Sequence, residues 1–134
     1  MGPGRAWLGV ELAVEDFAGW SIVMPDQSAQ QTQSAAQWLD AVVLRLRSAF
    51  DPSLVLLFGS RARGTATRRS DLDLLLVCET TDGPLERIGR VLRLLQDSPW
   101  PVEPVVLTPG ELAAMSHRPF IRRILAEGRV LYER

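Results

Sequence analysis

Apolar residues recur along much of the chain at spacings that predict alternating helices and strands. The first clear element is an amphipathic helix over 34–50, indicated by apolar residues every three or four positions: Ala35, Leu39, Val42, Val43, Leu46 and Phe50. Ser34 is the expected N-cap, and Asp51-Pro52 is the expected stop. A continuous apolar run over 54–58 predicts a buried strand. A second run over 71–77, apolar apart from Asp71 and Asp73, predicts another.

The remainder of the chain continues the alternation. We expect a helix from Pro84 to about 96, a strand over 102–107, a short helix capped by Thr108, a last helix closed by Gly128, and a strand over 130–132. Strands that alternate with helices predict a single α/β domain in which helices cover one sheet. Some connections are too short for every strand pair to be parallel, so the expected sheet is mixed.

The first 33 residues differ from the rest. Residues 1–23 carry large apolar side chains without a clean period, and residues 25–33 are polar and rich in Gln, which is typical of a linker or a frayed entry to a helix. We therefore separate an N-terminal extension, 1–33, for which little order is expected, from a domain over 34–134. One hypothesis is that residues 1–23 come from an over-extended start codon, since Met24 can begin a shorter protein.

Composition narrows the classes of function. The chain has 134 residues, enough for one domain, and a net charge of −1 that does not favour sequence-blind binding of nucleic acid. None of its 15 basic residues is Lys, which excludes a phosphate loop of the Walker type. The single cysteine, Cys78, is expected to be a buried thiol and fits a reducing compartment. Without an apolar run of about 20 residues or a signal layout, a cytoplasmic protein is expected, with no membrane partner.

The segment with the strongest chemical signal is residues 57–77, LFGSRARGTATRRSDLDLLLV. A buried strand leads to Gly59, which permits a sharp turn and a close approach to a ligand. Ser60 then offers a hydroxyl and an amide where a turn begins, a position suited to phosphate, and Arg61 and Arg63 add positive charge. The pattern predicts a turn that binds phosphate.

Two carboxylates open the following strand. Side chains alternate along a strand, so Asp71 and Asp73 are expected on one face, about 6–7 Å apart. Such a pair repels unless a cation lies between its members, and Mg²⁺ favours one or two carboxylates together with nucleotide phosphates. An isolated Asp-x-Asp is more often a solvated turn or strand end. Its position after a Gly-Ser turn at the tip of a buried strand favours the metal site.

The unit Gly59-Ser60, followed after ten residues by Asp71-x-Asp73, resembles the signature of the DNA polymerase β-like nucleotidyltransferase superfamily, and the short chain is similar to its minimal nucleotidyltransferases. The resemblance covers residues 36–133. It implies that Gly59 and Ser60 hold the nucleotide's phosphates, that Asp71 and Asp73 bind two Mg²⁺ ions, and that a third carboxylate completes the site. ATP or another nucleoside triphosphate would be the substrate, and its nucleoside monophosphate would pass to an acceptor hydroxyl.

Glu103 is the expected third carboxylate, because it is the one acidic residue in the apolar run 102–107. The alternative is that Glu103 is simply a solvated strand end. The family often has Asp here, and Pro104 removes a ladder donor, so we expect this strand at a sheet edge or bulged. In the two-metal mechanism that the resemblance implies, Asp71, Asp73 and Glu103 are both the catalytic residues and the metal ligands.

The acceptor is the open question, because the chain has no room for a second, acceptor-binding domain. The resemblance implies an antitoxin that modifies a tyrosine of a helical HEPN-type toxin partner, and a homodimer is a second way to complete the acceptor site. One alternative is a non-catalytic module that binds nucleotide or acts on its partner by contact alone. Another is a free-standing transferase for a small molecule, which an apolar groove beside Trp38 or Trp100 would favour.

Overall fold

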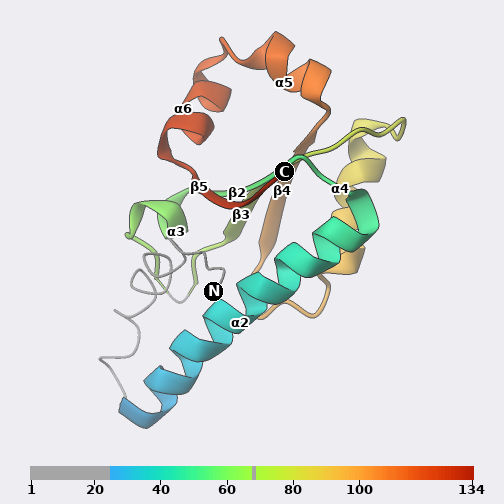
Figure 1. The fold of residues 1–134 in the computed structure, drawn as a ribbon. Helices are drawn as coiled ribbons and strands as arrows, with labels where there is room; N and C mark the ends of the chain where they lie inside the picture. Colours follow the sequence, from blue (N-terminus) through green and yellow to red (C-terminus); the bar gives the residue numbers. More distant parts are fainter. Residues whose placement is uncertain (1–24, 68) are drawn as a thin grey trace.

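The computed structural model describes residues 25–67 and 69–134, and the expectations for residues 1–24 lie outside them. Helices and strands alternate along the described chain, as Figure 1 shows. The elements are α2 (Pro25–Phe50), β2 (Leu54–Phe58), α3 (Ser60–Arg63), β3 (Leu72–Val77), α4 (Pro84–Leu94), β4 (Val102–Leu107), α5 (Pro109–Met115), α6 (Pro119–Glu127) and β5 (Arg129–Glu133). No described helix combines the length and the apolar character needed to cross a membrane.

The strands form one mixed sheet in the order β4-β3-β2-β5. Strand β2 is antiparallel to both β3 and β5, whereas β3 and β4 run parallel. The predicted α/β domain with a mixed sheet is therefore confirmed. Strand β4 lies at one edge of the described sheet, as the ladder donor lost at Pro104 led us to expect.

Helices cover both faces of this sheet, with α2 and α4 on one side and α5 and α6 on the other (Figure 1). On one face, Leu74 and Leu76 of β3 pack with residues of α2 and α4. On the other face, Leu75 and Val77 belong to the same apolar cluster as Ile121 and Ile124 of α6. Since β3 is buried from both sides, its apolar run is continuous rather than alternating.

Helix α2 departs from the sequence-based prediction. The pattern predicts a start at Ser34, whereas the helix begins at Pro25 and places Ser34 in its interior, so the predicted N-cap is wrong. Proline is well suited to the first turn of a helix, and the Gln and Ala residues that follow are good helix formers. These residues lack an apolar stripe, and for this reason the apolar pattern did not reveal the first turns.

The start of α5 and the end of α6 agree with the sequence-based prediction. Thr108 and Glu111 form the expected capping box at the start of α5. Gly128 ends α6, but its backbone is extended (φ −71°, ψ 153°) rather than left-handed. Glycine is required there for space, because a Cβ atom would lie 2.7 Å from the Ile124 carbonyl oxygen and would overlap the Leu56 side chain.

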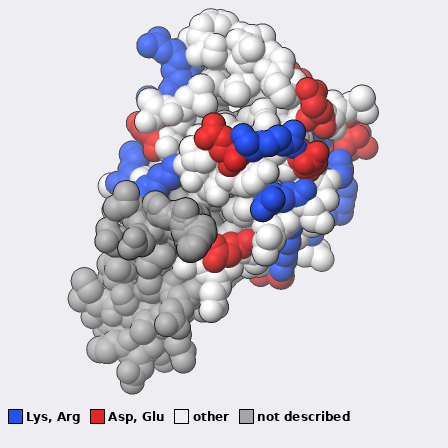
Figure 2. All heavy atoms as spheres, viewed as in Figure 1, with Lys and Arg blue, Asp and Glu red and all other residues white. Residues whose placement is uncertain are grey.

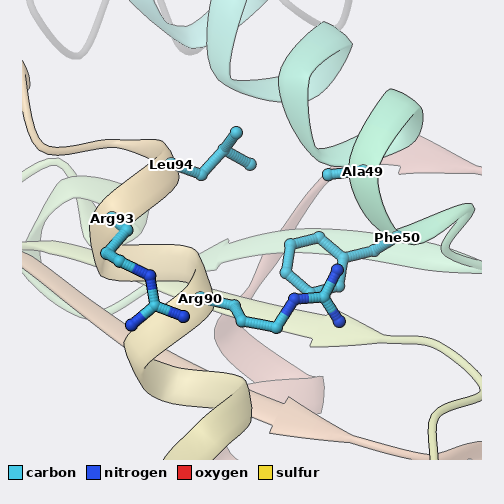
Figure 3. Close-up of a pocket in the computed structure, with 5 residues that line it drawn as sticks. All are labelled: Ala49, Phe50, Arg90, Arg93 and Leu94. Atoms are coloured by element: carbon cyan, nitrogen blue, oxygen red, sulfur yellow. The ribbon is translucent and has the colours of Figure 1, made fainter.

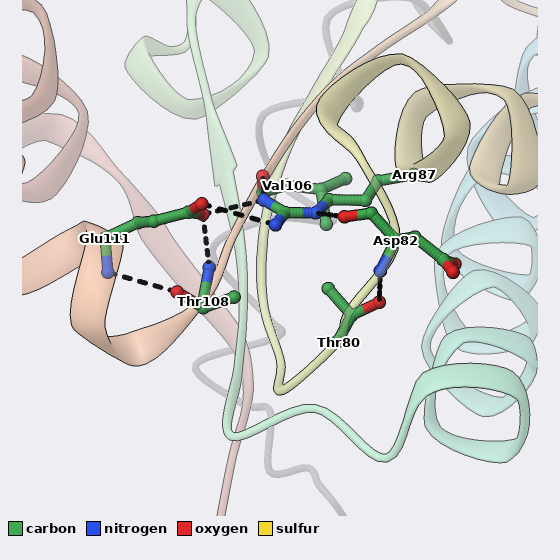
Figure 4. A network of polar contacts seen from close by, with 6 residues as sticks. All are labelled: Thr80, Asp82, Arg87, Val106, Thr108 and Glu111. Atoms are coloured by element: carbon green, nitrogen blue, oxygen red, sulfur yellow. Dashed lines mark hydrogen bonds and ion pairs between the residues drawn. The ribbon is translucent and has the colours of Figure 1, made fainter.

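An ion pair between a buried arginine and a partly exposed glutamate joins α4 to α5 at the end of β4 (Figure 4). The Arg87 side chain is 8% exposed, and its guanidinium donates to both carboxylate oxygens of Glu111, at 2.7 and 3.2 Å. It also donates to the backbone carbonyls of Asp82 and Val106. Arg87 therefore fixes the positions of two helices that follow different strands.

Candidate metal centre

Three carboxylates from two neighbouring strands meet at one end of the sheet. Asp71 immediately precedes β3, Asp73 is its second residue, and Glu103 lies opposite Asp73 in the parallel register of β4. One oxygen from each of the three lies within 4.8 Å of the others. Asp71 and Asp73 are half-buried and Glu103 is exposed. The structure thus brings together the three residues predicted as metal ligands, in a geometry that a hard divalent cation can bridge.

The Gly59-Ser60 turn packs directly against this carboxylate cluster. Strand β2 ends at Phe58, the register partner of Asp73, so the chain turns beside that carboxylate. Gly59 has φ 76° and ψ −157°, and a Cβ atom there would lie 3.1 Å from the Asp73 Cγ and still closer to Oδ2. Only glycine suits both the backbone angle and the space. Ser60 then begins α3, where the first amides of a helix have no carbonyl partner within it.

The three carboxylates of the cluster repel one another, and this repulsion changes the pKa of Asp73. The pKa of Asp73 is raised to about 6, first by burial, then by repulsion from Glu103 and Asp71, while Arg61 and Arg63 lower it. A carboxylate whose ionisation is disfavoured by its carboxylate neighbours is stabilised when a cation joins them. The same arrangement that destabilises Asp73 as an anion therefore favours a bound metal.

The two arginines of the turn differ sharply in their surroundings. Arg63 is exposed and forms an ion pair of 3.2 Å with Glu127 of α6. Arg61 is only 1% exposed, and burial lowers its pKa to about 10 although Asp73 and Asp71 act to raise it. Its guanidinium donates to the backbone carbonyls of Ser70 and Asp71. Arg63 thus keeps the accessibility that a phosphate ligand needs, whereas Arg61 is part of the protein interior.

Trp100 is a residue of this region that the sequence did not single out for the metal site. Its ring lies beneath the Arg61 guanidinium, 4.7 Å from the ring centroid to Cζ. The signal in the sequence is weak: a Trp between two prolines, three residues before Glu103. Nothing in residue spacing pairs it with an arginine that lies far away along the chain.

Surface depressions of the described residues lie apart from the three carboxylates. One of about 320 Å³ lies between α2 and α4, where Arg90 stacks over the Phe50 ring (Figure 3), and none of the predicted site residues lines it. Another, of about 290 Å³, adjoins Trp100 and the start of β4. Acidic and basic side chains are intermixed on the face seen in Figure 2, so its described residues form no continuous basic surface there.

A mixed sheet that places a Gly-Ser turn beside three clustered carboxylates is the arrangement of a nucleotidyltransferase. Residues 44–134 match the family described as Polymerase beta, Nucleotidyltransferase. The chain belongs to this family and is a nucleotidyltransferase, as its sequence signature predicted.

A relative from Methanocaldococcus jannaschii, named as a candidate protein adenylyltransferase, is 32% identical over 105 residues, which are 72% of this chain and 70% of the relative. Two solved structures share the fold. One is a toxin–antitoxin crystallised with AMP-PNP (TM-score 0.56, 20% identity, 72% of this chain and 73% of that one). The other is a candidate nucleotidyltransferase from Sulfolobus solfataricus (TM-score 0.55, 22% identity, 91% of this chain and 87% of that one).

Proposed function

We propose that this nucleotidyltransferase transfers AMP from Mg-ATP to a hydroxyl of a partner protein, as the antitoxin of a HEPN-type toxin–antitoxin pair. The observation that carries the chemistry is the meeting of Asp71, Asp73 and Glu103 within 4.8 Å beside the Gly59-Ser60 turn. A protein acceptor is supported by the name of the M. jannaschii relative, and an antitoxin role by the toxin–antitoxin that shares the fold.

The carboxylate cluster fits the metal that this chemistry uses. Three carboxylate oxygens suit Mg²⁺, which is usually bound by few carboxylates and completes its shell with phosphate and water. Asp71, Asp73 and Glu103 would together hold two Mg²⁺ ions. Bound Mg²⁺ would neutralise charge on the triphosphate and lower the pKa of the acceptor hydroxyl.

The other residues of the site bind the phosphates, and Glu103 accepts a proton. In this proposal, Gly59 lets the chain approach the β- and γ-phosphates and Ser60 donates to them, while Arg63 adds a positive charge that already acts on Asp73. Glu103 is exposed on β4, at an edge of the described sheet, where it can meet an acceptor presented by another protein. It accepts the hydroxyl proton as the acceptor oxygen bonds to the α-phosphorus, the bond from that phosphorus to the β-phosphate oxygen breaks, and pyrophosphate leaves.

The test uses ATP labelled at the α-phosphate, with Mg²⁺, purified protein and an extract of the source organism. The wild type is compared with Asp71→Asn/Asp73→Asn and with Glu79→Gln, which removes an exposed carboxylate beyond the other end of β3. We expect label on one discrete protein with the wild type and Glu79→Gln and none with the double variant. Mass spectrometry of the labelled band should find AMP on a tyrosine of a helical protein.

Other outcomes identify the alternatives. No label despite binding of Mg-ATP, or neutralisation of the partner by the double variant, would favour a module that binds nucleotide or acts by contact alone. Label confined to a low-mass product would favour a small-molecule transferase. The depression of about 290 Å³ beside Trp100 approaches the size of small ligand pockets, but its exposed lining is not predominantly apolar, as the expected groove would be. The Trp100 ring also stacks against the Arg61 guanidinium, so that face of the ring is not open to a small-molecule substrate.

A further inference from the structure

Arg61 connects the three segments that supply the metal site. Its backbone belongs to α3, directly after the Gly59-Ser60 turn. Its Nε donates to the Asp71 carbonyl at 3.1 Å, and its Nη2 donates to the Ser70 carbonyl. The face of its guanidinium lies on Trp100, three residues before Glu103. A single buried residue of α3 thus contacts both the residues that lead into β3 and the residues that lead into β4.

The strands beside Arg61 are joined at the same level. The Leu72 amide donates to the Pro101 carbonyl at 2.7 Å, so the residue between the two aspartates is bonded to the residue next to Trp100. Leu72 is itself fully buried. Asp71 precedes the first residue of β3, and its carbonyl is held by the Arg61 side chain. Arg61 therefore holds the backbone from which the Asp71 carboxylate projects.

We propose that Arg61 is a positioning residue that sets the geometry of the metal site from within the protein, without contacting the metal or the nucleotide. Its planar guanidinium donates to the Ser70 and Asp71 carbonyls, and stacking on the Trp100 ring fixes the guanidinium in place. A lysine cannot replace it, because an ammonium group neither bridges two carbonyls with a rigid fork nor stacks flat on an indole. The inference rests on the proposed metal-binding role of Asp71, Asp73 and Glu103.

Charge and geometry predict opposite results when Arg61 is removed. The guanidinium is a cation close to Asp71 and Asp73, so on charge alone its loss would strengthen the binding of a divalent metal. If Arg61 acts by position, its loss lets the Asp71 carboxylate leave the cluster and weakens that binding. Partners that orient metal ligands typically contribute about 10–100-fold to metal affinity.

The experiment measures Mn²⁺ binding by the loss of the free-ion EPR signal, which requires no catalytic activity. The variants are Arg61→Met and Arg61→Lys, and the matched control is Arg45→Lys. Arg45 also stacks on a tryptophan, 4.7 Å above Trp38, and also donates to a backbone carbonyl, but it lies between α2 and α4. Urea unfolding of each variant confirms that the protein is folded at the temperature of the binding assay.

We expect both Arg61 variants to bind Mn²⁺ about tenfold more weakly or worse, and Arg45→Lys to bind within about twofold of the wild type. Equal or tighter binding by Arg61→Met would overturn the inference, as would full affinity in Arg61→Lys. If neither Arg61 variant folds, Trp100→Leu decides, because it removes the ring and leaves the arginine. We expect a loss of at least threefold from it, and unchanged affinity would overturn the inference. A wild type that does not bind Mn²⁺ would instead refute the proposed function.

Discussion

Gly59→Ala is the substitution that most directly tests how the Gly59-Ser60 turn and the carboxylate cluster depend on each other. The glycine has φ 76° and ψ −157°, a combination that is essentially confined to glycine. The new methyl group would overlap the Asp73 carboxylate, whose Cγ lies 3.1 Å from the ideal Cβ position. Either the turn shifts away from β3 or Asp73 rotates out of the cluster.

The size of the effect follows from these two terms. The backbone conformation costs an alanine about 1–3 kcal/mol of unfolding free energy. The overlap adds a similar amount if nothing moves, but rotation of Asp73 relieves it and transfers the loss to metal binding. We therefore expect the free energy of unfolding to fall by about 1–3 kcal/mol, or roughly 4 °C in melting temperature per kcal/mol. The affinity for Mn²⁺ should fall by at least about tenfold, since a ligand leaves the site.

Urea unfolding and EPR titration with Mn²⁺ measure the two quantities on the same protein. The control is Gly110→Ala in α5, where the added Cβ would lie 3.9 Å from the Thr108 Oγ1, an ordinary contact. Its stability should be unchanged or higher by about 0.5–1 kcal/mol, because alanine is the better helix former. If Gly59→Ala kept both the stability and the Mn²⁺ affinity of the wild type, the close packing of the turn on Asp73 would be refuted.

Three further predictions concern single side chains. The pKa of Asp73, raised to about 6 from 3.8, means that the folded protein retains a proton that the unfolded chain has lost. Asp73 should therefore make the metal-free protein less stable as pH rises from about 4 to 6. Asp73→Asn should remove this fall in EDTA melts and raise stability at pH 7.5, and equal pH profiles for the two proteins would contradict the reasoning. Glu111→Gln leaves the buried Arg87 guanidinium without its counter-charge and should cost about 1–3 kcal/mol in urea unfolding. Mn²⁺ affinity should not change, because this pair lies at the other end of β4; a parallel loss of affinity would show that the two ends are coupled. Burial raises the pKa of the Cys78 thiol, so Ellman's reagent should label it only after unfolding, and rapid labelling of the native protein would refute its burial.

Local patterns were sufficient for most of the secondary structure. Buried strands such as β2 and β3 are short and uniformly apolar, and the capping box at Thr108 is specified by two residues three positions apart. The start of α2 was not predicted, because residues 25–33 form helix without an apolar face. Propensity alone is a weak signal where no packing pattern accompanies it.

The turn and the two aspartates of the candidate site could be predicted because they are close along the chain. Strand alternation places Asp71 and Asp73 on one face, and Gly59-Ser60 follows directly from a strand end. Glu103 was selected as an acidic residue in an apolar run, but its place beside Asp73 depends on the parallel register of β3 and β4. A register between strands that lie so far apart in the chain is set by the packed helices on both faces of the sheet.

The sequence by itself determined the class of fold, the Gly59-Ser60 turn after β2 and the paired aspartates, because each depends on neighbours within a few residues. Only the tertiary structure decided that Arg61 is an internal residue while Arg63 remains at the surface. Two arginines separated by one alanine cannot be told apart by composition. Their surroundings differ because α3 turns one toward Trp100 and the entry to β3, and the other toward Glu127 of α6.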